Sequence, residues 1–333
     1  MRSHLANEGE QSIQSAVETP AGEQMAAAVW QGLRAKPKSL PPWLFYDEAG
    51  SRLFEQITQL PEYYITRTER GILSAFAGQM VERASGGHRV RLVELGAGSA
   101  DKTRLLLAAA VERQGDVVYE PVDVSASALA AARKRIEREI PDVLVAPRVV
   151  DYTRNLTVAP RTDGARRMVL YIGSSIGNFD PEDAARLLRN LHAALQPGDS
   201  LLLGVDLVKD EWRMQAAYDD AAGVTAAFNL NLLARLNREL DADFDTENFV
   251  HRALWNEQER RMEMHLESRT RLKVYVAELD MQVDFERGER IHTENSYKYL
   301  PGEAAEMLQR AGFTATEKWN DPPAWFEVCL GRA

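Results

Sequence analysis

Short apolar runs alternate with amphipathic stretches through the middle of the chain. Five of these runs are typical of buried strands and cover residues 89–95, 117–124, 143–150, 168–172 and 200–207. The intervening stretches have apolar residues at helical spacing and cover residues 101–113, 126–140 and a segment that begins at Pro181. Strands separated by helices of about 10–15 residues are typical of a parallel sheet with helices on both faces, so the pattern predicts an α/β fold.

The pattern changes after residue 207. Apolar residues from Phe228 to Leu240 recur at helical spacing and predict one long amphipathic helix. Residues 249–299 alternate apolar with polar positions, which is typical of antiparallel strands. A helix over 302–311 and two strands over 313–319 and 325–330 then complete a sheet of seven strands. We therefore expect the segment after residue 207 to be an insertion in the α/β unit, packed with the mostly helical residues 26–60.

A glycine-rich loop follows the first expected strand. The string ELGAGSADKT, residues 94–103, opens a helix at the place where a nucleotide meets a doubly wound sheet. Glycines there allow the backbone to approach a ligand closely and to turn tightly. Asp101 stands where a dinucleotide fingerprint has its third glycine. An acidic residue followed by Gly-x-Gly without that third glycine is the usual form in S-adenosylmethionine-dependent methyltransferases. An ordinary glycine turn is the alternative interpretation.

Polar residues also end the next three expected strands. Asp123 ends the second strand, where a carboxylate can accept both ribose hydroxyls, and Asp151 with Tyr152 follows the third, suited to an adenine ring. Taken alone, each aspartate is more often a turn or cap residue. Asn178, in the GSSIGN string after the fourth strand, suits a carboxylate or amide, although it is equally a candidate cap for the helix at Pro181. Lys102 is either a ligand contact or a solvated helix side chain.

The order of several longer strings resembles one family. FYDEAGS (45–51), LPEYYITRTE (60–69), the glycine loop, PVDVS, GSSIGN, YDDAAG (218–223) and TENS (293–296) follow one another between residues 40 and 330. In this order the chain resembles the EgtD family, the histidine-specific Nα-methyltransferases of ergothioneine biosynthesis. The resemblance implies a Rossmann-like class I methyltransferase sheet of seven strands with an inserted α+β substrate-binding domain.

The resemblance also implies roles for single residues. It implies that S-adenosylmethionine is held by Gly96, Lys102, Asp123, Asp151 and Tyr152. It implies that the substrate carboxylate is bound by Tyr63, Asn178 and Tyr218. It also implies that the imidazole is bound by Glu294 and Ser296, with Met264 lining that pocket. Tyr46 matches the tyrosine beside the amine that is methylated, with the Gly173 carbonyl close by. Asn295, Tyr297 and Tyr299 are less familiar neighbours in this motif, which bears on the shape of the pocket.

The spacing of Glu294 and Ser296 is consistent with both side chains binding the same imidazole. Residues two apart in a strand point to the same face, so these two side chains project together while Thr293 and Asn295 point away. A carboxylate and a hydroxyl can address both nitrogens of one imidazole. A surface strand with outward polar residues is the alternative for this segment taken alone.

These patterns predict three parts of the chain. Residues 1–24 are polar and are expected to be a flexible tail. We expect the cofactor-binding methyltransferase domain to comprise residues 67–207 and 297–333. The substrate-binding domain is then expected to comprise residues 25–66 and 208–296.

Composition narrows the expected partners. Forty basic and fifty acidic side chains give a net charge of −10, which argues against nucleic acid and against an anionic membrane surface. A single cysteine, Cys329, fits a reducing compartment, and the polar first residues do not resemble a secretory signal, so a cytoplasmic protein is expected. The six histidines have no metal-ligand spacing, so no metal is expected. We expect a monomer whose partners are small molecules.

The resulting hypothesis is trimethylation of the α-amine of L-histidine to hercynine, with three molecules of S-adenosylhomocysteine as by-product. Within the same class, the alternative substrate is another aromatic amino acid, such as tryptophan or a prenylated derivative. A nicotinamide-dependent oxidoreductase is a remote alternative, which Asp101 in the loop disfavours. An adenosyl-binding module without catalysis is disfavoured because both sets of polar residues are present.

Overall fold

The computed structural model describes residues 20–152 and 164–333, which fall into two compact units. The first unit comprises residues 20–63, 211–258 and 262–295, and the second comprises the described residues of 64–210 together with 259–261 and 296–333. Most of the expected tail, residues 1–19, lies outside the described residues. Helix α2 begins at Pro20 and so includes residues 20–24 of the expected tail.

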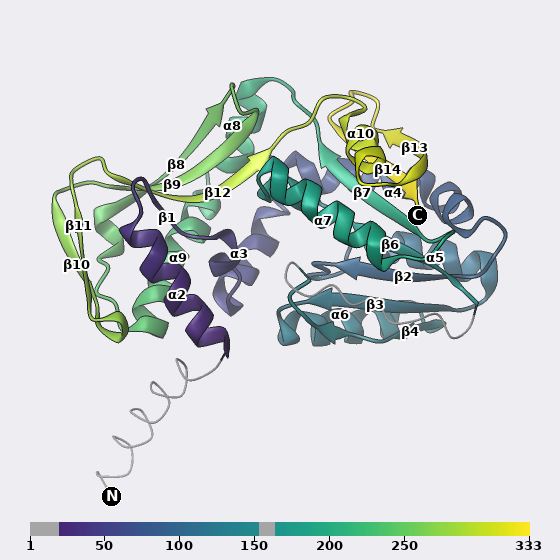
Figure 1. Cartoon of the computed structure of the whole chain (residues 1–333), viewed down its shortest axis with the longest axis horizontal. Helices are drawn as coiled ribbons and strands as arrows, with labels where there is room; N and C mark the ends of the chain where they lie inside the picture. The colour runs from purple at the N-terminus through teal and green to yellow at the C-terminus, as the bar shows by residue number, and fades with distance from the viewer. Residues whose placement is uncertain (1–19, 153–163) are drawn as a thin grey trace, which may run out of the picture. The chain divides into compact units, whose positions relative to one another are not determined.

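The second unit contains a sheet of eight strands, seven of them on one continuous path in the order β13-β14-β7-β6-β2-β3-β4, with β5 paired to β3 (Figure 1). The strands are β2 (Val90–Leu95), β3 (Val117–Asp123), β4 (Val143–Val145), β5 (Arg148–Val149), β6 (Arg166–Tyr171), β7 (Ser200–Asp206), β13 (Thr314–Asn320) and β14 (Phe326–Arg332). Strands β2 to β7 pair in parallel, whereas β14 is antiparallel to both β7 and β13. The predicted Rossmann-like sheet is confirmed.

Helices cover this sheet on both faces (Figure 1). They are α4 (Tyr64–Ser85), α5 (Thr103–Gln114), α6 (Ala126–Glu139), α7 (Pro181–Ala194) and α10 (Glu303–Arg310), with the short 3-10 turn η2 (Ser175–Asn178). Leucines of α7 and α10 share one buried cluster with side chains of the central strands, such as Val169 and Leu203. Helix α4 packs against α5 and the sheet strands, and α6 packs against β3 and β4. The strands are therefore buried on both sides, as their apolar sequences predict.

The strand order brings three strand ends together. β2 lies between β3 and β6, with Leu95 opposite Val122 and Glu94 opposite Leu170. Because these three strands are parallel, the loops that follow them leave the same edge of the sheet. In sheets of this kind, ligands bind at the carboxyl ends of the strands.

The first unit contains two sheets and four helices (Figure 1). One sheet has the order β1-β12-β9-β8, with β1 (Lys38–Ser39), β8 (Phe249–Asn256), β9 (Arg261–Ser268) and β12 (Arg290–Tyr297); the other pairs β10 (Leu272–Val276) with β11 (Met281–Phe285). The helices are α2 (Pro20–Arg34), α3 (Glu48–Ile57), α8 (Glu211–Tyr218) and α9 (Val224–Leu240), with 3-10 turns η1 (Pro42–Phe45), η3 (Thr246–Asn248) and η4 (Ala277–Leu279). Helix α9 is the predicted amphipathic helix and packs against α3 and β8.

Two local expectations differ from the structure. The strand expected over 143–150 is divided into β4 and β5 on either side of Pro147, whose ring removes a backbone donor from the ladder. The segment 249–299 is antiparallel as expected in β10 and β11, but β12 also pairs in parallel with β1, through Lys38 opposite Ile291.

Among the helices in the described part of the chain, none is long and apolar enough to cross a membrane.

Candidate active site

The glycine loop leaves β2 with three residues in the left-handed backbone region. Gly96, Gly98 and Ala100 have φ values of 69°, 49° and 53°. The amide nitrogen of Gly96 donates to the Val122 carbonyl at 2.8 Å, which fixes the loop to the end of the neighbouring strand β3. A Cβ atom added to Gly98 would meet no heavy atom within 4 Å, so the loop leaves open space on this side. Glycine is favoured here because it adopts positive φ without steric cost.

Asp123 joins this loop to the following helix. One of its carboxylate oxygens accepts the Gly98 amide at 3.1 Å, and the other accepts the Ser125 amide at 2.9 Å. A carboxylate has about four acceptor positions, so further hydrogen bonds are possible on both oxygens. Ser125 in turn caps helix α6 by accepting the Ala128 amide at 3.2 Å. Asp123 is therefore both a turn residue, as one alternative had it, and an acceptor beside the glycine loop.

Tyr152 lies beside the glycine loop. Its hydroxyl oxygen is 3.4 Å from the position that a Cβ of Gly96 would occupy, and its ring packs edge-on against Tyr171 with 5.9 Å between the centroids. Burial raises the pKa of Tyr152 to about 12, so the phenol is neutral at physiological pH. Asp151 precedes it directly, after strand β5. The structure thus places the adenine-binding candidates at the same edge as the loop.

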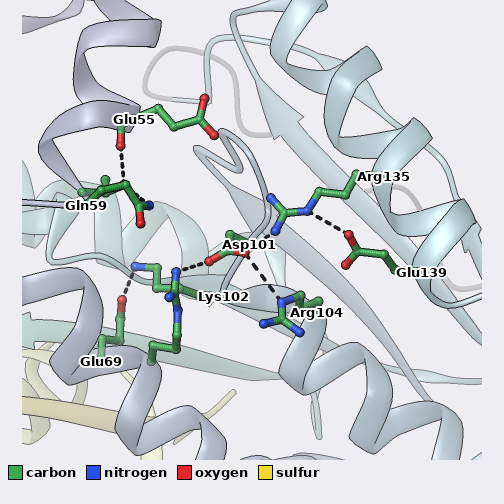
Figure 2. Close-up of polar contacts among 10 residues, drawn as sticks. Glu55, Gln59, Glu69, Asp101, Lys102, Arg104, Arg135 and Glu139 are labelled. Atoms are coloured by element: carbon green, nitrogen blue, oxygen red, sulfur yellow. Dashed lines mark hydrogen bonds and ion pairs between the residues drawn. The ribbon is translucent and has the colours of Figure 1, made fainter.

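Lys102 pairs with a buried carboxylate that the sequence did not single out. Figure 2 shows its ammonium group pointing to Glu69, with which it forms an ion pair. Glu69 is fully buried in α4, and its two oxygens also accept the Gly173 amide at 2.9 and 3.0 Å. A Cβ atom on Gly173 would lie 3.2 Å from the Lys102 nitrogen. Lys102 is therefore no solvated side chain but part of a cluster that reaches the end of β6.

Asp101, the sixth residue counted from Gly96, is surrounded by arginine side chains. It forms ion pairs with Arg70, Arg104 and Arg135, the last two labelled with it in Figure 2. Burial alone would raise the pKa of Asp101, but these guanidinium groups outweigh burial and hold it below its ordinary value. The side chain that stands in place of a third glycine thus joins α4, α5 and α6 at the loop.

Glu94 is buried at the end of β2, just before the loop. It accepts the Thr103 hydroxyl at 2.6 Å and also accepts the Tyr119 hydroxyl. Burial raises the pKa of Glu94 to about 7, and the hydrogen bonds from Thr103 and Tyr119 oppose this rise. Because Thr103 is the first residue of α5, the bond ties the start of that helix to the strand.

Asn178 ends the 3-10 turn η2, which is packed closely against β12. A Cβ on Gly177 would fall 2.8 Å from the Tyr297 carbonyl oxygen, so only glycine allows this approach. The Ser174 hydroxyl accepts the Asp206 amide at 3.0 Å and fixes the turn to β7. The cap position of helix α7 is Asp180, so Asn178 is not the helix cap that one interpretation proposed.

Ser296 is held by a buried lysine. The Lys298 ammonium donates to the Ser296 hydroxyl oxygen at 2.9 Å and pairs with Asp206 at 2.9 Å. Asp206 also pairs with Lys209 and accepts the Tyr64 hydroxyl at 2.8 Å. Burial would raise the pKa of Asp206, but the two ammonium groups outweigh it and lower the pKa. An ammonium has no acceptor, so Ser296 accepts in this bond and its own hydrogen points elsewhere.

In the first unit, Tyr46 and Tyr63 flank one phenylalanine. The ring of Phe54 packs edge-on against both, with centroids 5.8 Å from Tyr46 and 6.3 Å from Tyr63. Phe228 of helix α9 lies 5.9 Å from Tyr46. These edge-to-face contacts, in the range that aromatic pairs prefer, hold the two tyrosines on the same aromatic cluster.

A buried polar network connects the other substrate-binding candidates of the first unit. His251 Nε2 lies 2.8 Å from the Tyr218 carbonyl, which only accepts, so Nε2 carries the hydrogen and Nδ1 accepts from Asn229 at 2.9 Å. Asn229 also donates to the His265 carbonyl at 3.1 Å. Burial lowers the pKa of His251, and the bond to Tyr218 opposes this, so the ring is neutral.

Thr293 extends this network to strand β9. Its hydroxyl lies 2.9 Å from the Asn229 amide oxygen and 3.0 Å from the Met264 carbonyl. Thr293 directly precedes Glu294, which is also buried. The backbone at Tyr218, Met264 and Glu294 is therefore tied to one set of buried hydrogen bonds.

Strand β12 carries both Glu294 and Ser296, and the division between the two units falls between Asn295 and Ser296. Within each unit the structure gathers part of the candidate residues. The second unit holds Gly96, Lys102, Asp123, Asp151, Tyr152, Gly173, Asn178 and Ser296, and the first holds Tyr46, Tyr63, Tyr218, Met264 and Glu294. Sequence reasoning missed the supporting residues Glu69, Asn229 and Lys298. Glu69 and Asn229 each stand as a polar residue on an otherwise apolar helix face, whereas Lys298 directly follows strand β12. Among the described residues, no cluster of three or more His, Cys, Asp or Glu side chains is arranged to hold a metal ion.

Several known proteins resemble this chain along most of its length. Residues 25–333 match the family described as histidine-specific, S-adenosylmethionine-dependent methyltransferases. The histidine N-alpha-methyltransferase of Mycolicibacterium smegmatis is 47% identical over 310 residues, which cover 93% of this chain and 95% of that protein. The enzyme of the same name from Mycobacterium tuberculosis is 47% identical over 302 residues, 91% of this chain and 92% of its own. Ergothioneine biosynthesis protein 1 of Neurospora crassa is 32% identical over 295 residues, 85% of this chain and 32% of that protein.

Proposed function

Because this chain belongs to the family of histidine-specific, S-adenosylmethionine-dependent methyltransferases, we propose that it trimethylates the α-amine of L-histidine. The product is hercynine, so the reaction is the first step of ergothioneine biosynthesis. The observation that carries this proposal is the 47% identity to a histidine N-alpha-methyltransferase along nearly the whole of both chains.

The second unit has the groups that S-adenosylmethionine requires. Asp123 retains acceptor positions for the ribose hydroxyls, and Asp151 with Tyr152 suits the adenine. The open side of Gly98 leaves room for the ligand beside the loop, and Lys102 and Gly96 complete the proposed set. When bound, the cofactor supplies a methyl group on a cationic sulfur and leaves as S-adenosylhomocysteine. We assign the cofactor to the second unit and most of the substrate contacts to the first.

The substrate is proposed to be held at both of its ends. Its carboxylate would be bound by Tyr63, Asn178 and Tyr218, whereas its imidazole would be bound by Glu294 and Ser296, with Met264 alongside. The Ser296 oxygen accepts from Lys298, and its hydroxyl is proposed to donate to the lone pair of one imidazole nitrogen when histidine binds. Glu294 accepts from the nitrogen that carries the hydrogen. This division of donor and acceptor suits a neutral imidazole.

Each transfer forms one N–C bond, breaks one C–S bond and requires a neutral amine. An α-amino group titrates near about 8 in peptides, and the amine loses one proton before each of the three transfers. Tyr46 is proposed to orient the amine and relay this proton, and the Gly173 carbonyl to accept a hydrogen bond from it. Much of the acceleration then comes from holding nitrogen, methyl and sulfur in line.

The test is a product assay with purified protein, S-adenosylmethionine and single amino acids. Histidine should yield species carrying one, two and then three added methyl groups, detected by mass spectrometry, whereas tryptophan and tyrosine should stay unmodified. Methylation of tryptophan without methylation of histidine would move the substrate within the class. No methylation of any amino acid would contradict the proposal.

A further inference from the structure

Glu69 is a fully buried carboxylate in the first turns of helix α4. Burying a charge is costly unless it is paired and hydrogen-bonded. Glu69 meets both conditions. It forms the ion pair with Lys102 (Figure 2), and its two oxygens accept the Gly173 amide at 2.9 and 3.0 Å. One side chain thus connects α4, the start of α5 and the end of β6.

The sheet is built to receive this carboxylate. A Cβ atom on Gly204 would lie 2.3 Å from a Glu69 carboxylate oxygen, closer than any real contact. Gly204 interrupts the leucine run of β7, a buried strand in which glycine lacks a side chain to pack. The gap at Gly204 therefore gives Glu69 its place over the sheet.

The charge on Glu69 bears on the cofactor, because Lys102 and Gly173 are residues of the proposed site. A cationic cofactor beside a lone ammonium group would be repelled, and a neighbouring carboxylate cancels that repulsion. S-adenosylmethionine and S-adenosylhomocysteine differ by one methyl group and one positive charge. A carboxylate in this place therefore favours the donor over its by-product.

We infer that Glu69 is a positioning residue that sets Lys102 and the Gly173 backbone relative to each other and offsets the Lys102 charge, so that the cationic donor binds in preference to the neutral by-product. This inference rests on the proposed function. A carboxylate that only stabilises the fold would affect the binding of both ligands alike.

The test measures dissociation constants of both ligands by titration calorimetry for Glu69→Gln, which removes the charge and keeps the shape. For a sulfonium within about 10 Å, one charge at an effective dielectric constant near 20 changes affinity by about tenfold. We expect the ratio of the donor's dissociation constant to that of the by-product to rise by about this factor. The matched control is Glu82→Gln in the same helix, where an exposed ion pair with Arg113 is removed. Its ratio should equal that of the unmodified protein.

A second variant covers the case in which Glu69→Gln does not fold. Lys102→Met keeps the carboxylate and removes the ammonium, so the same ratio should fall instead of rise. Weaker binding of both ligands by equal factors in either variant would overturn the inference. If the unmodified protein binds both ligands and methylates histidine, that result leaves the proposed function intact. A protein that binds neither ligand contradicts the proposed function itself.

Discussion

Replacing Thr293 by valine tests whether the buried network holds the histidine-binding residues in place. The threonine is fully buried, and its one hydroxyl lies 2.9 Å from the Asn229 oxygen and 3.0 Å from the Met264 carbonyl. Valine keeps the shape but leaves these two buried acceptors without that donor. An unsatisfied buried group costs about 1–3 kcal/mol, so we expect the free energy of unfolding to fall by that amount.

The lost hydrogen bonds should also weaken the binding of histidine. If about 1.4 kcal/mol of it must be recovered to align Glu294 when histidine binds, the histidine KM rises about tenfold. Binding of S-adenosylmethionine should not change, because every contact of the Thr293 hydroxyl lies within the first unit.

The assay combines thermal unfolding, histidine kinetics and calorimetric titration of the cofactor. Thr103→Val is the matched control, since this threonine is equally buried and donates to Glu94 in the second unit. Thr103→Val should lower the free energy of unfolding by a similar amount and lower the affinity for S-adenosylmethionine, while the histidine KM stays unchanged. If Thr293→Val lowers stability and both affinities together, or lowers stability alone, the positioning role of the network is refuted.

Three further predictions concern single carboxylate and ammonium groups. Glu294→Ala should raise the histidine KM by about 10–100-fold, the worth of a charge-assisted hydrogen bond, with cofactor titration unchanged; equal loss of cofactor affinity would mean that the residue acts elsewhere. Glu94, whose pKa burial raises to about 7 from its ordinary value of 4.5, binds more protons in the folded state between these values. The stability that Glu94 contributes is full below pH 4.5 and is lost as pH rises through 7. Glu94→Gln should therefore reduce the change in the free energy of unfolding over this pH range, measured with urea, by on the order of 3 kcal/mol. An unchanged pH profile would show that Glu94 is not the group that causes it. Lys298→Met removes one of the two ammonium groups that pair with fully buried Asp206 and should lower the free energy of unfolding by about 3–5 kcal/mol in denaturant titration. Adding Asp206→Asn should recover little of this loss, because Lys209 then loses its carboxylate partner; full recovery in the double variant would contradict a network of two ion pairs.

The sequence predicted the sheet well because its central strands are buried on both faces. Strand β2, expected over 89–95, spans Val90–Leu95, and β7, expected over 200–207, spans Ser200–Asp206. Local hydrophobicity could not predict β1, because two residues carry no periodicity and their pairing with β12 joins distant parts of the chain. The division of residues 143–150 did have a local signal, which is Pro147 itself, but the apolar pattern on both sides of it predicted one continuous strand.

The candidate site was predictable where it consists of a loop after a strand. The glycine loop, Asp123 and Tyr152 lie at one sheet edge because parallel strands bring their carboxyl ends together. The supporting residues were not predictable, since their partners are remote in sequence: Glu69 accepts from Gly173 over 104 positions, and Asn229 bonds to Thr293 over 64. A buried polar residue in a helix gives no local indication of which distant group satisfies it.

The most direct measurement of the proposed reaction identifies the atom that receives the methyl groups. The purified protein is incubated with histidine labelled with ¹⁵N at its α-amine and with S-adenosylmethionine labelled with ¹³C at its methyl group, and the product is analysed by NMR. We predict equivalent methyl carbons coupled to the α-nitrogen, which identify a trimethylated amine. Methyl carbons without that coupling, attached instead to an imidazole nitrogen, would contradict the proposed Nα-methylation.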